Sequence, residues 1–216
     1  MGSPYEIWHS LLHTPYLLAR VQRAHYRQTR ITGHLRKASE GIEKGFTKPR
    51  TKHSWTGVPS ITVAAAVNKK RVIMWHTLDK PWNGTTAADM YQGPLLAALR
   101  RTYGKKKSYT IVEDGDRKGN QSGKGLKAKS KAKIRALTLP PRTPSLMPLD
   151  FAMWHEIENR MEKSMPKGRE TKEAFIKRLE KTARALPPSV VGKAVGQTKP
   201  NIKAIVDAKG RHPKND

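Results

Sequence analysis

The chain has 216 residues, enough for one or two domains with a hydrophobic core. Its 43 Lys and Arg against 17 Asp and Glu give a formal net charge of +26, and self-repulsion on this scale predicts an anionic partner. The sequence has no cysteine, which excludes a disulfide scaffold, a zinc ribbon and a thiol nucleophile. Its longest nearly apolar run, residues 61–67, is too short to span a bilayer, so no membrane partner is expected.

Residues 1–57 differ from the rest in their charges. Glu6 is the only acid before Ser39, and no lysine occurs before Lys37. This pattern is typical of a mitochondrial transit segment, or else of a basic arm that lies along a phosphate backbone. We assign 1–57 as a basic N-terminal arm or extension and expect a mitochondrial location, with the nucleus as the alternative. The early cations are Arg20, Arg23, Arg27, Arg30 and Arg36.

Residues 58–163 have the pattern of an ordered α/β domain. The β-branched runs 61–67 and 71–75, joined by a polar turn, predict a hairpin. Thr85 or Thr86 can begin a helix, which Gly93 and Pro94 should interrupt before a second helical segment at 95–103. Residues 108–112 and 134–139 are predicted strands, and the apolar periodicity of 149–163 predicts a helix.

Residues 164–216 are predicted to form a basic, helical C-terminal extension. Thr171 should begin a helix that ends at Pro187 and Pro188. Two shorter amphipathic segments follow at 190–195 and 202–206.

Two aspartates stand where metal chemistry could use them. Asp114 follows a predicted strand and Asp150 opens a predicted helix. Carboxylates delivered from such ends can converge on Mg²⁺, and two metal ions held in this way can catalyse phosphodiester exchange. A solvated acid at a strand end and an N-cap aspartate explain the same two positions without any chemistry.

The residues around these aspartates form a longer pattern. It comprises Ser108-Tyr-Thr-Ile-Val-Glu-Asp-Gly-Asp116 and Leu139-Pro-Pro-Arg-Thr-Pro-Ser-Leu-Met-Pro-Leu-Asp-Phe-Ala-Met-Trp154. This pattern resembles the catalytic domain of mariner-type transposases from about residue 58 onward, with the Pro-Leu-Asp block as its specific part. The resemblance implies a ribonuclease-H-like mixed sheet flanked by helices, with Asp114 as the second metal-binding acid and Asp150 as the third.

The chain also departs from the family pattern. The family's first acid lies on an opening strand, but no aspartate precedes Asp79, and none of the early glutamates ends an apolar run. Gly115, Ser145 and Met147 are further departures. Loss of one metal ligand should lower the rate by a factor of about a thousand or more. We therefore expect no enzyme activity, no metal and no cofactor, with Asp114 and Asp150 as a remnant pair.

Basic residues cluster between Arg100 and Arg135, where 13 Lys and Arg stand against three acids, a local net charge of +10. Only 6% of residues are aromatic, which favours contact with the phosphate backbone over base readout. The predicted nucleic-acid contacts are the five early arginines and Lys105, Lys106, Lys107, Lys124, Lys127, Lys129, Lys131 and Lys133.

Three functional hypotheses follow from these observations. The favoured one is an inactive, transposase-derived, structural RNA-binding protein of a large ribonucleoprotein such as a mitochondrial ribosome, with RNA preferred over DNA and with neighbouring proteins as further partners. The alternative is a Mg²⁺-dependent transposase or integrase fragment that acts on DNA, with its third carboxylate from Glu40, Glu43 or another chain. The third hypothesis is a chromatin-associated DNA binder.

Overall fold

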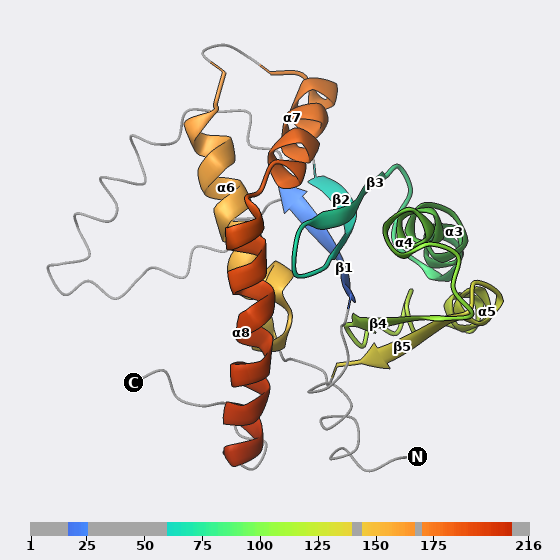
Figure 1. Ribbon diagram of the computed structural model, residues 1–216. Helices are drawn as coiled ribbons and strands as arrows, with labels where there is room; N and C mark the ends of the chain where they lie inside the picture. Colours follow the sequence, from blue (N-terminus) through green and yellow to red (C-terminus); the bar gives the residue numbers. More distant parts are fainter. Residues whose placement is uncertain (1–16, 26–59, 140–143, 167–169, 209–216) are drawn as a thin grey trace, which may run out of the picture.

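The computed structural model describes residues 17–25, 60–139, 144–166 and 170–208 (Figure 1). Within these ranges the strands form a five-stranded mixed sheet in the order β3-β2-β1-β4-β5. The strands are β1 (Leu17–His25), β2 (Ser60–Val67), β3 (Val72–Leu78), β4 (Tyr109–Glu113) and β5 (Ile134–Thr138). β1 pairs antiparallel with β2 and parallel with β4, and β5 is parallel to β4.

The central strand β1 lies inside the segment that the sequence assigned to a basic arm. That assignment is corrected for residues 17–25, because eight of them pair with β2 and three pair with β4. The two arginines of β1 interrupt its apolar residues, so the strand has no clean period of two in the sequence. Its place in the sheet depends on pairing partners more than 30 residues away.

The strand β2 is buried on both faces of the sheet, and its sequence shows why. Successive side chains of a strand point to opposite faces. Val63 and Ala65 belong to the core cluster on one face, and Ala64 and Ala66 belong to the cluster on the other. An unbroken apolar run is the pattern expected of a strand covered on both sides.

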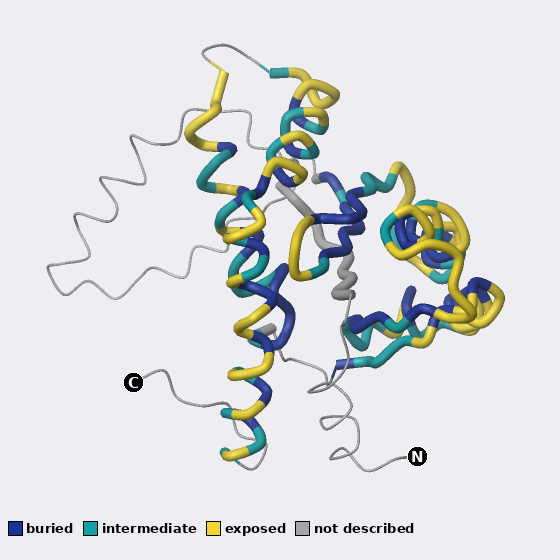
Figure 2. Tube along the Cα trace, viewed as in Figure 1, coloured by how far each residue is buried: buried dark blue, intermediate teal, exposed yellow. Residues whose placement is uncertain are grey.

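Helices pack against both faces (Figures 1 and 2). One face carries α6 (Trp154–Lys163), α7 (Lys172–Arg184) and α8 (Pro188–Asp207), whose apolar residues share a core cluster with β2 and β3. The other face carries α3 (Gly84–Met90), the π-helix η2 (Tyr91–Leu95), α4 (Leu96–Tyr103) and α5 (Gly123–Lys131). The short helices η3 (Pro144–Leu146) and η4 (Leu149–Met153) precede α6.

Most predicted elements are present, with three differences. Gly93 and Pro94 do not break the helical path, because the wide turn of η2 accommodates a proline that has no N–H to donate. Asn83, and not a threonine, caps α3, with Thr86 completing a capping box. The segments predicted at 190–195 and 202–206 form one helix, α8, which contains Pro200. The predicted hairpin, the helix over 149–163 and the Thr171 cap are confirmed.

Candidate functional site

The candidate site lies where β4 and β5 end and the loop 114–122 leads into α5. Asp114 follows the last residue of β4, as the sequence predicts, and is half-buried. The side-chain amide of Asn120 donates to Asp114 Oδ1 at 2.6 Å and to the Asp114 carbonyl at 3.1 Å. These bonds fold the loop back onto the strand end and hold the Asp114 carboxylate in place.

Glu113, one residue earlier, is the centre of a buried polar network. Its side chain is 1% exposed, and its carboxylate accepts hydrogen bonds from the Lys129 ammonium and the Tyr91 hydroxyl. Gln121 Nε2 lies 3.3 Å from Glu113 Oε1 and donates to Thr138 Oγ1 at 2.9 Å. The network therefore joins β4, β5, α5 and η2 at one point.

The electrostatics of this network follow from its burial. Burial raises the pKa of the Glu113 carboxyl above its ordinary value, and the adjacent Lys129 ammonium opposes part of that rise. Burial, and then the negative charge of Glu113, raises the pKa of the Tyr91 phenol well above its usual range. Tyr91 therefore keeps its proton and remains a hydrogen-bond donor to Glu113.

Lys129 departs from its predicted role as a phosphate contact. It is 4% exposed, its ammonium is bonded to Glu113, and the same nitrogen lies 5.2 Å from the centroid of the Tyr91 ring. The buried side of α5, which includes Gly125, Ala128 and Lys129, packs against the sheet and α3. We therefore withdraw the prediction that Lys129 contacts phosphate. The other lysines predicted as contacts are exposed: Lys105, Lys106, Lys107, Lys124, Lys127, Lys131 and Lys133.

The arginines predicted as contacts fall into two groups. Arg20 and Arg23 belong to the central strand β1 and not to an arm. Arg27, Arg30 and Arg36 lie outside the described residues.

A second contact holds the loop beside Asp114. Asp116 Oδ2 accepts from Trp82 Nε1 at 2.8 Å and from the Gly119 backbone at 2.6 Å. A Cβ at Gly119 would lie 2.3 Å from the Trp82 ring, so glycine is required for this approach. The loop is thereby fixed against the segment that precedes α3.

Asp150, the other predicted carboxylate, is the second residue of η4. It is half-buried, and its backbone N–H donates to the Met147 carbonyl at 2.8 Å. Val112, two residues before Asp114, and Leu149, one residue before Asp150, belong to the same core cluster. That Asp114 and Asp150 face each other across a short distance stays a prediction.

The register of β1 shows whether this strand can place a third carboxylate beside Asp114. Ala19 pairs with Glu113, so the next residues along the two parallel strands are Arg20 and Asp114. The nine residues of β1, Leu-Leu-Ala-Arg-Val-Gln-Arg-Ala-His, include no acid. Mg²⁺ takes oxygen ligands, and β1 offers no carboxylate for a magnesium pair at this register position. Within the described ranges, no three His, Asp or Glu residues are grouped so as to hold a metal ion.

Sequence reasoning identified Asp114 and Asp150, gave Lys129 a different role, and missed Glu113, Tyr91 and Asn120. These residues are brought together from positions up to 38 apart, and no local pattern links them. A glutamate at the end of an apolar strand was the one available signal.

No helix in the described part of the chain is long and apolar enough to cross a membrane.

The sequence matches no protein-family model and no curated protein. The structure is similar to the catalytic domain of Mos1 mariner transposase, with a TM-score of 0.69 and 10% identity over 95% of this chain and 91% of that one. It is also similar to Mos1 transposase in a paired-end complex with the left transposon end (TM-score 0.70, 11% identity, 97% of this chain) and in a strand transfer complex (0.65, 12%, 97%). This chain spans 62% and 60% of the transposase chains in those two complexes. At these identities the likeness shows the fold alone.

The ion pair between Lys129 and Glu113 should carry a large part of the stability. Lys129→Met leaves the Glu113 carboxylate buried without its cation, and we expect a loss of about 3–5 kcal/mol in the free energy of unfolding. The matched control is Lys127→Met on the exposed side of α5, which should change stability by less than about 0.5 kcal/mol. Urea denaturation of both variants measures the difference, and equal small losses would contradict the buried pair.

Tyr91→Phe tests the raised pKa of the phenol. Below pH 10 the unfolded and folded chains both keep this proton, and the lost hydrogen bond to Glu113 should cost about 1–3 kcal/mol. Above about pH 10 the unfolded wild-type phenol ionises while the folded one does not, so the wild type loses stability that the variant keeps. The stability gap between the two proteins should therefore narrow in urea titrations from pH 9 to 11. A constant gap would show an unperturbed phenol.

Proposed function

We propose that this chain, which has the fold of the mariner-type transposase catalytic domain, is a transposase-derived nucleic-acid-binding protein that has lost strand-transfer chemistry. Its mixed sheet, with helices on both faces, supports assignment to the ribonuclease-H-like class. In this assignment Asp114 and Asp150 are the remnants of a metal-binding set whose first member was on β1.

The observation that carries the loss of chemistry is the sequence of β1 in its register with β4. Arg20 is the residue that follows Ala19, the partner of Glu113, and Asp114 follows Glu113. Two-metal phosphodiester exchange needs carboxylates to clamp both metal ions. β1 has no carboxylate to place beside the second acid, so this strand does not supply the missing ligand.

The carboxylates at the end of β4 form hydrogen bonds and an ion pair within the chain. Glu113 is neutralised by Lys129 and bonded to Tyr91, and Asn120 donates to Asp114. These bonds stabilise the end of β4 as a structural joint. A side-chain amide directed at Asp114 supports a structural role for that carboxylate.

Binding to nucleic acid is supported by the charge and by the fold. A net charge of +26 favours association with a polyanion. Mos1 transposase, which has this fold, is bound to a transposon end in one of the similar structures. We therefore take duplex DNA as the first partner to test. Structured RNA, the partner that the sequence favoured, and a role in a ribonucleoprotein are the competing prediction.

Purified protein with Mg²⁺ or Mn²⁺ should neither nick nor join plasmid DNA above background. The expected rate lies a factor of about a thousand or more below that of an active enzyme, because β1 carries no carboxylate to serve as the first metal ligand. Agarose-gel assays on supercoiled and linear plasmid measure both reactions, with an active mariner transposase as the positive control. Strand transfer that Asp150→Ala abolishes would instead establish the magnesium-dependent DNA enzyme.

Binding to nucleic acid should depend steeply on salt and little on sequence. If about six to ten cations contact phosphates, affinity for a 30-base-pair duplex should fall roughly 10³- to 10⁵-fold between about 50 and 200 mM salt. Fluorescence anisotropy with DNA and RNA duplexes of matched length and two unrelated sequences measures the slope and the preference. A shallow slope, or tight binding to one sequence alone, would contradict a backbone contact. Tighter binding to the RNA duplex would favour the ribonucleoprotein role.

A further inference from the structure

The two ends of the sheet differ in their charged residues, and the strand directions show which residues lie at each end. Because β4 and β5 run parallel and β2 runs antiparallel to β1, the β2–β3 turn lies at the same end as the starts of β4 and β5. Glu113 and Asp114 lie at the opposite end, which we call the carboxylate end. The end with the turn, which we call the basic end, carries Lys69, Lys70, Arg71, Arg100, Arg101, Lys105, Lys106, Lys107, Lys131 and Lys133, all exposed.

Hydrogen bonds between distant segments form the basic end. Asn68 Nδ2, in the β2–β3 turn, donates to the hydroxyl of Tyr103 at the end of α4, at 3.1 Å. The Tyr109 N–H, at the start of β4, donates to the Lys133 carbonyl at 3.0 Å, and the Tyr109 hydroxyl donates to the Gly104 carbonyl at 2.6 Å. The turn, the end of α4, the loop 104–108 and the start of β5 therefore form one continuous surface.

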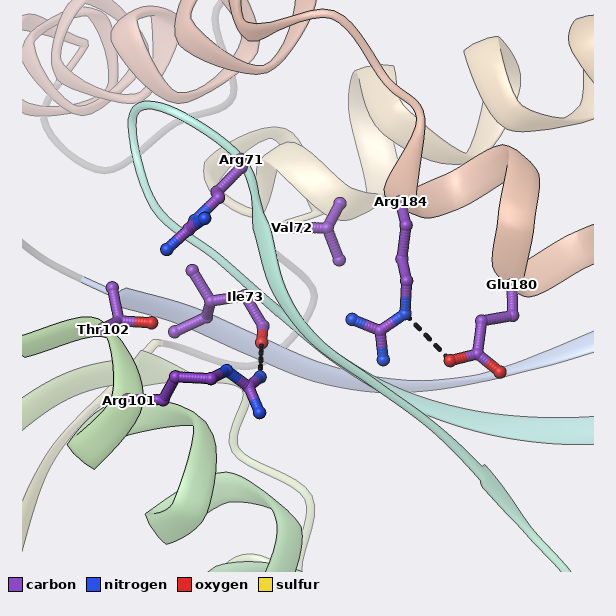
Figure 3. Close-up of a pocket in the computed structure, with 7 residues that line it drawn as sticks. All are labelled: Arg71, Val72, Ile73, Arg101, Thr102, Glu180 and Arg184. Carbon is purple, nitrogen blue, oxygen red and sulfur yellow. Dashed lines mark hydrogen bonds and ion pairs between the residues drawn. The ribbon is translucent and has the colours of Figure 1, made fainter.

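A cavity of about 430 Å³ opens beside this surface, along the outer edge of β3 (Figure 3). Arg101 Nη2 donates to the Ile73 carbonyl at 3.2 Å, and Arg184 Nη2 donates to the Trp75 carbonyl at 3.3 Å. Arg184 also pairs with Glu180, the one acid that lines the cavity. Across the described residues, no hydrogen bond or ion pair holds the guanidinium of Arg71, which lines the same cavity.

Helix ends explain only part of this charge. Cations are favourable at helix C-termini, which accounts for Arg100 and Arg101 in the last turn of α4 and for Lys131 in the last turn of α5. The turn 69–71 and the loop residues 105–107 lie outside helices, so the helix dipole does not account for their lysines and arginine. No acid occurs in 68–71, in 100–112 or in 117–149. Repulsion among these groups is relieved by an anion that contacts several of them at once.

The scarcity of exposed aromatic residues favours a duplex over a single strand. Single strands bind by stacking bases on exposed aromatic rings. Tyr103, 39% exposed, is the one exposed large aromatic residue within the described ranges, and its hydroxyl already accepts from Asn68. A duplex presents a regular row of phosphates, which lysine and arginine contact without base readout.

We propose that the basic end binds the phosphate backbone of duplex DNA, with Arg71 and its cavity at one side and the loop 105–107 at the other. This inference rests on the proposed function and adds to it the surface that binds. DNA bound in this way lies at the end of the sheet away from Asp114. The chain thus uses a surface separate from the end of β4.

The test compares three variants that each remove three exposed positive charges. Two act at the basic end: Lys69→Gln/Lys70→Gln/Arg71→Gln in the turn and Lys105→Gln/Lys106→Gln/Lys107→Gln in the loop. The matched control is Lys80→Gln/Arg117→Gln/Lys118→Gln near the carboxylate end, where Trp82 and Asp116 join the two segments. All nine positions are exposed, and thermal melting checks that each variant folds as the wild type does.

The readout is the slope of log affinity against log salt for a 30-base-pair DNA duplex, measured by anisotropy. Each lost phosphate contact should reduce the slope by about one, so each basic-end variant should lose up to about three units and the control should keep the wild-type slope. Equal losses in all three variants would mean that net charge alone governs binding, and a loss confined to the control would place the DNA at the carboxylate end. Either result overturns the proposal.

Two further outcomes separate this proposal from the function on which it rests. Wild-type protein that binds neither DNA nor RNA overturns the proposed function itself, and the surface with it. Wild-type protein that binds DNA while the basic-end variants bind equally well overturns the surface alone. Binding to an RNA duplex only, through the same residues, would overturn the choice of DNA.

Discussion

The buried ion pair between Lys129 and Glu113 is the interaction on which the arrangement of β4, α5 and η2 depends. Both groups are almost fully removed from water, and each would be costly to bury alone. Their pairing, with the Tyr91 hydroxyl as a second donor, fixes α5 against the sheet in one position. That position in turn places the loop 114–122 over the end of β4 and sets which lysines of α5 remain exposed.

The two ends of the sheet differ in whether their charged groups have partners within the chain. At the carboxylate end, negative groups are satisfied internally by Lys129, Tyr91, Asn120 and Trp82. At the basic end, the cations of the β2–β3 turn and of the loop 105–107 are exposed, with no acid nearby in sequence. The exposed cations thus gather at the end of the sheet away from Asp114, in a fold similar to that of Mos1 transposase in a paired-end complex with the left transposon end.

Elements with a local sequence pattern were predicted correctly. The strand whose pairing partners are distant in the sequence was not predicted. The run 61–67 predicts a strand by itself, and Thr171 followed by the apolar spacing of Phe175 and Leu179 predicts a capped helix. The strand β1 could not be predicted in this way, because its arginines break the alternation and its partners lie in β2 and β4. Asp114 was placed correctly at a strand end, whereas Glu113 was not recognised as the buried residue beside it.

By itself the sequence determined the net charge, the absence of any aspartate before Asp79 and the apolar runs that form strands with packed residues on both faces. These are properties of composition and short spacing, which hold however the chain is folded. The tertiary structure alone decided that Lys129 is buried while Lys127 is exposed, that Arg20 follows the β1 residue paired with Glu113, and that the scattered basic segments meet at one end of the sheet. Burial and strand register are set by contacts between residues far apart in the chain, so no local pattern could have specified them.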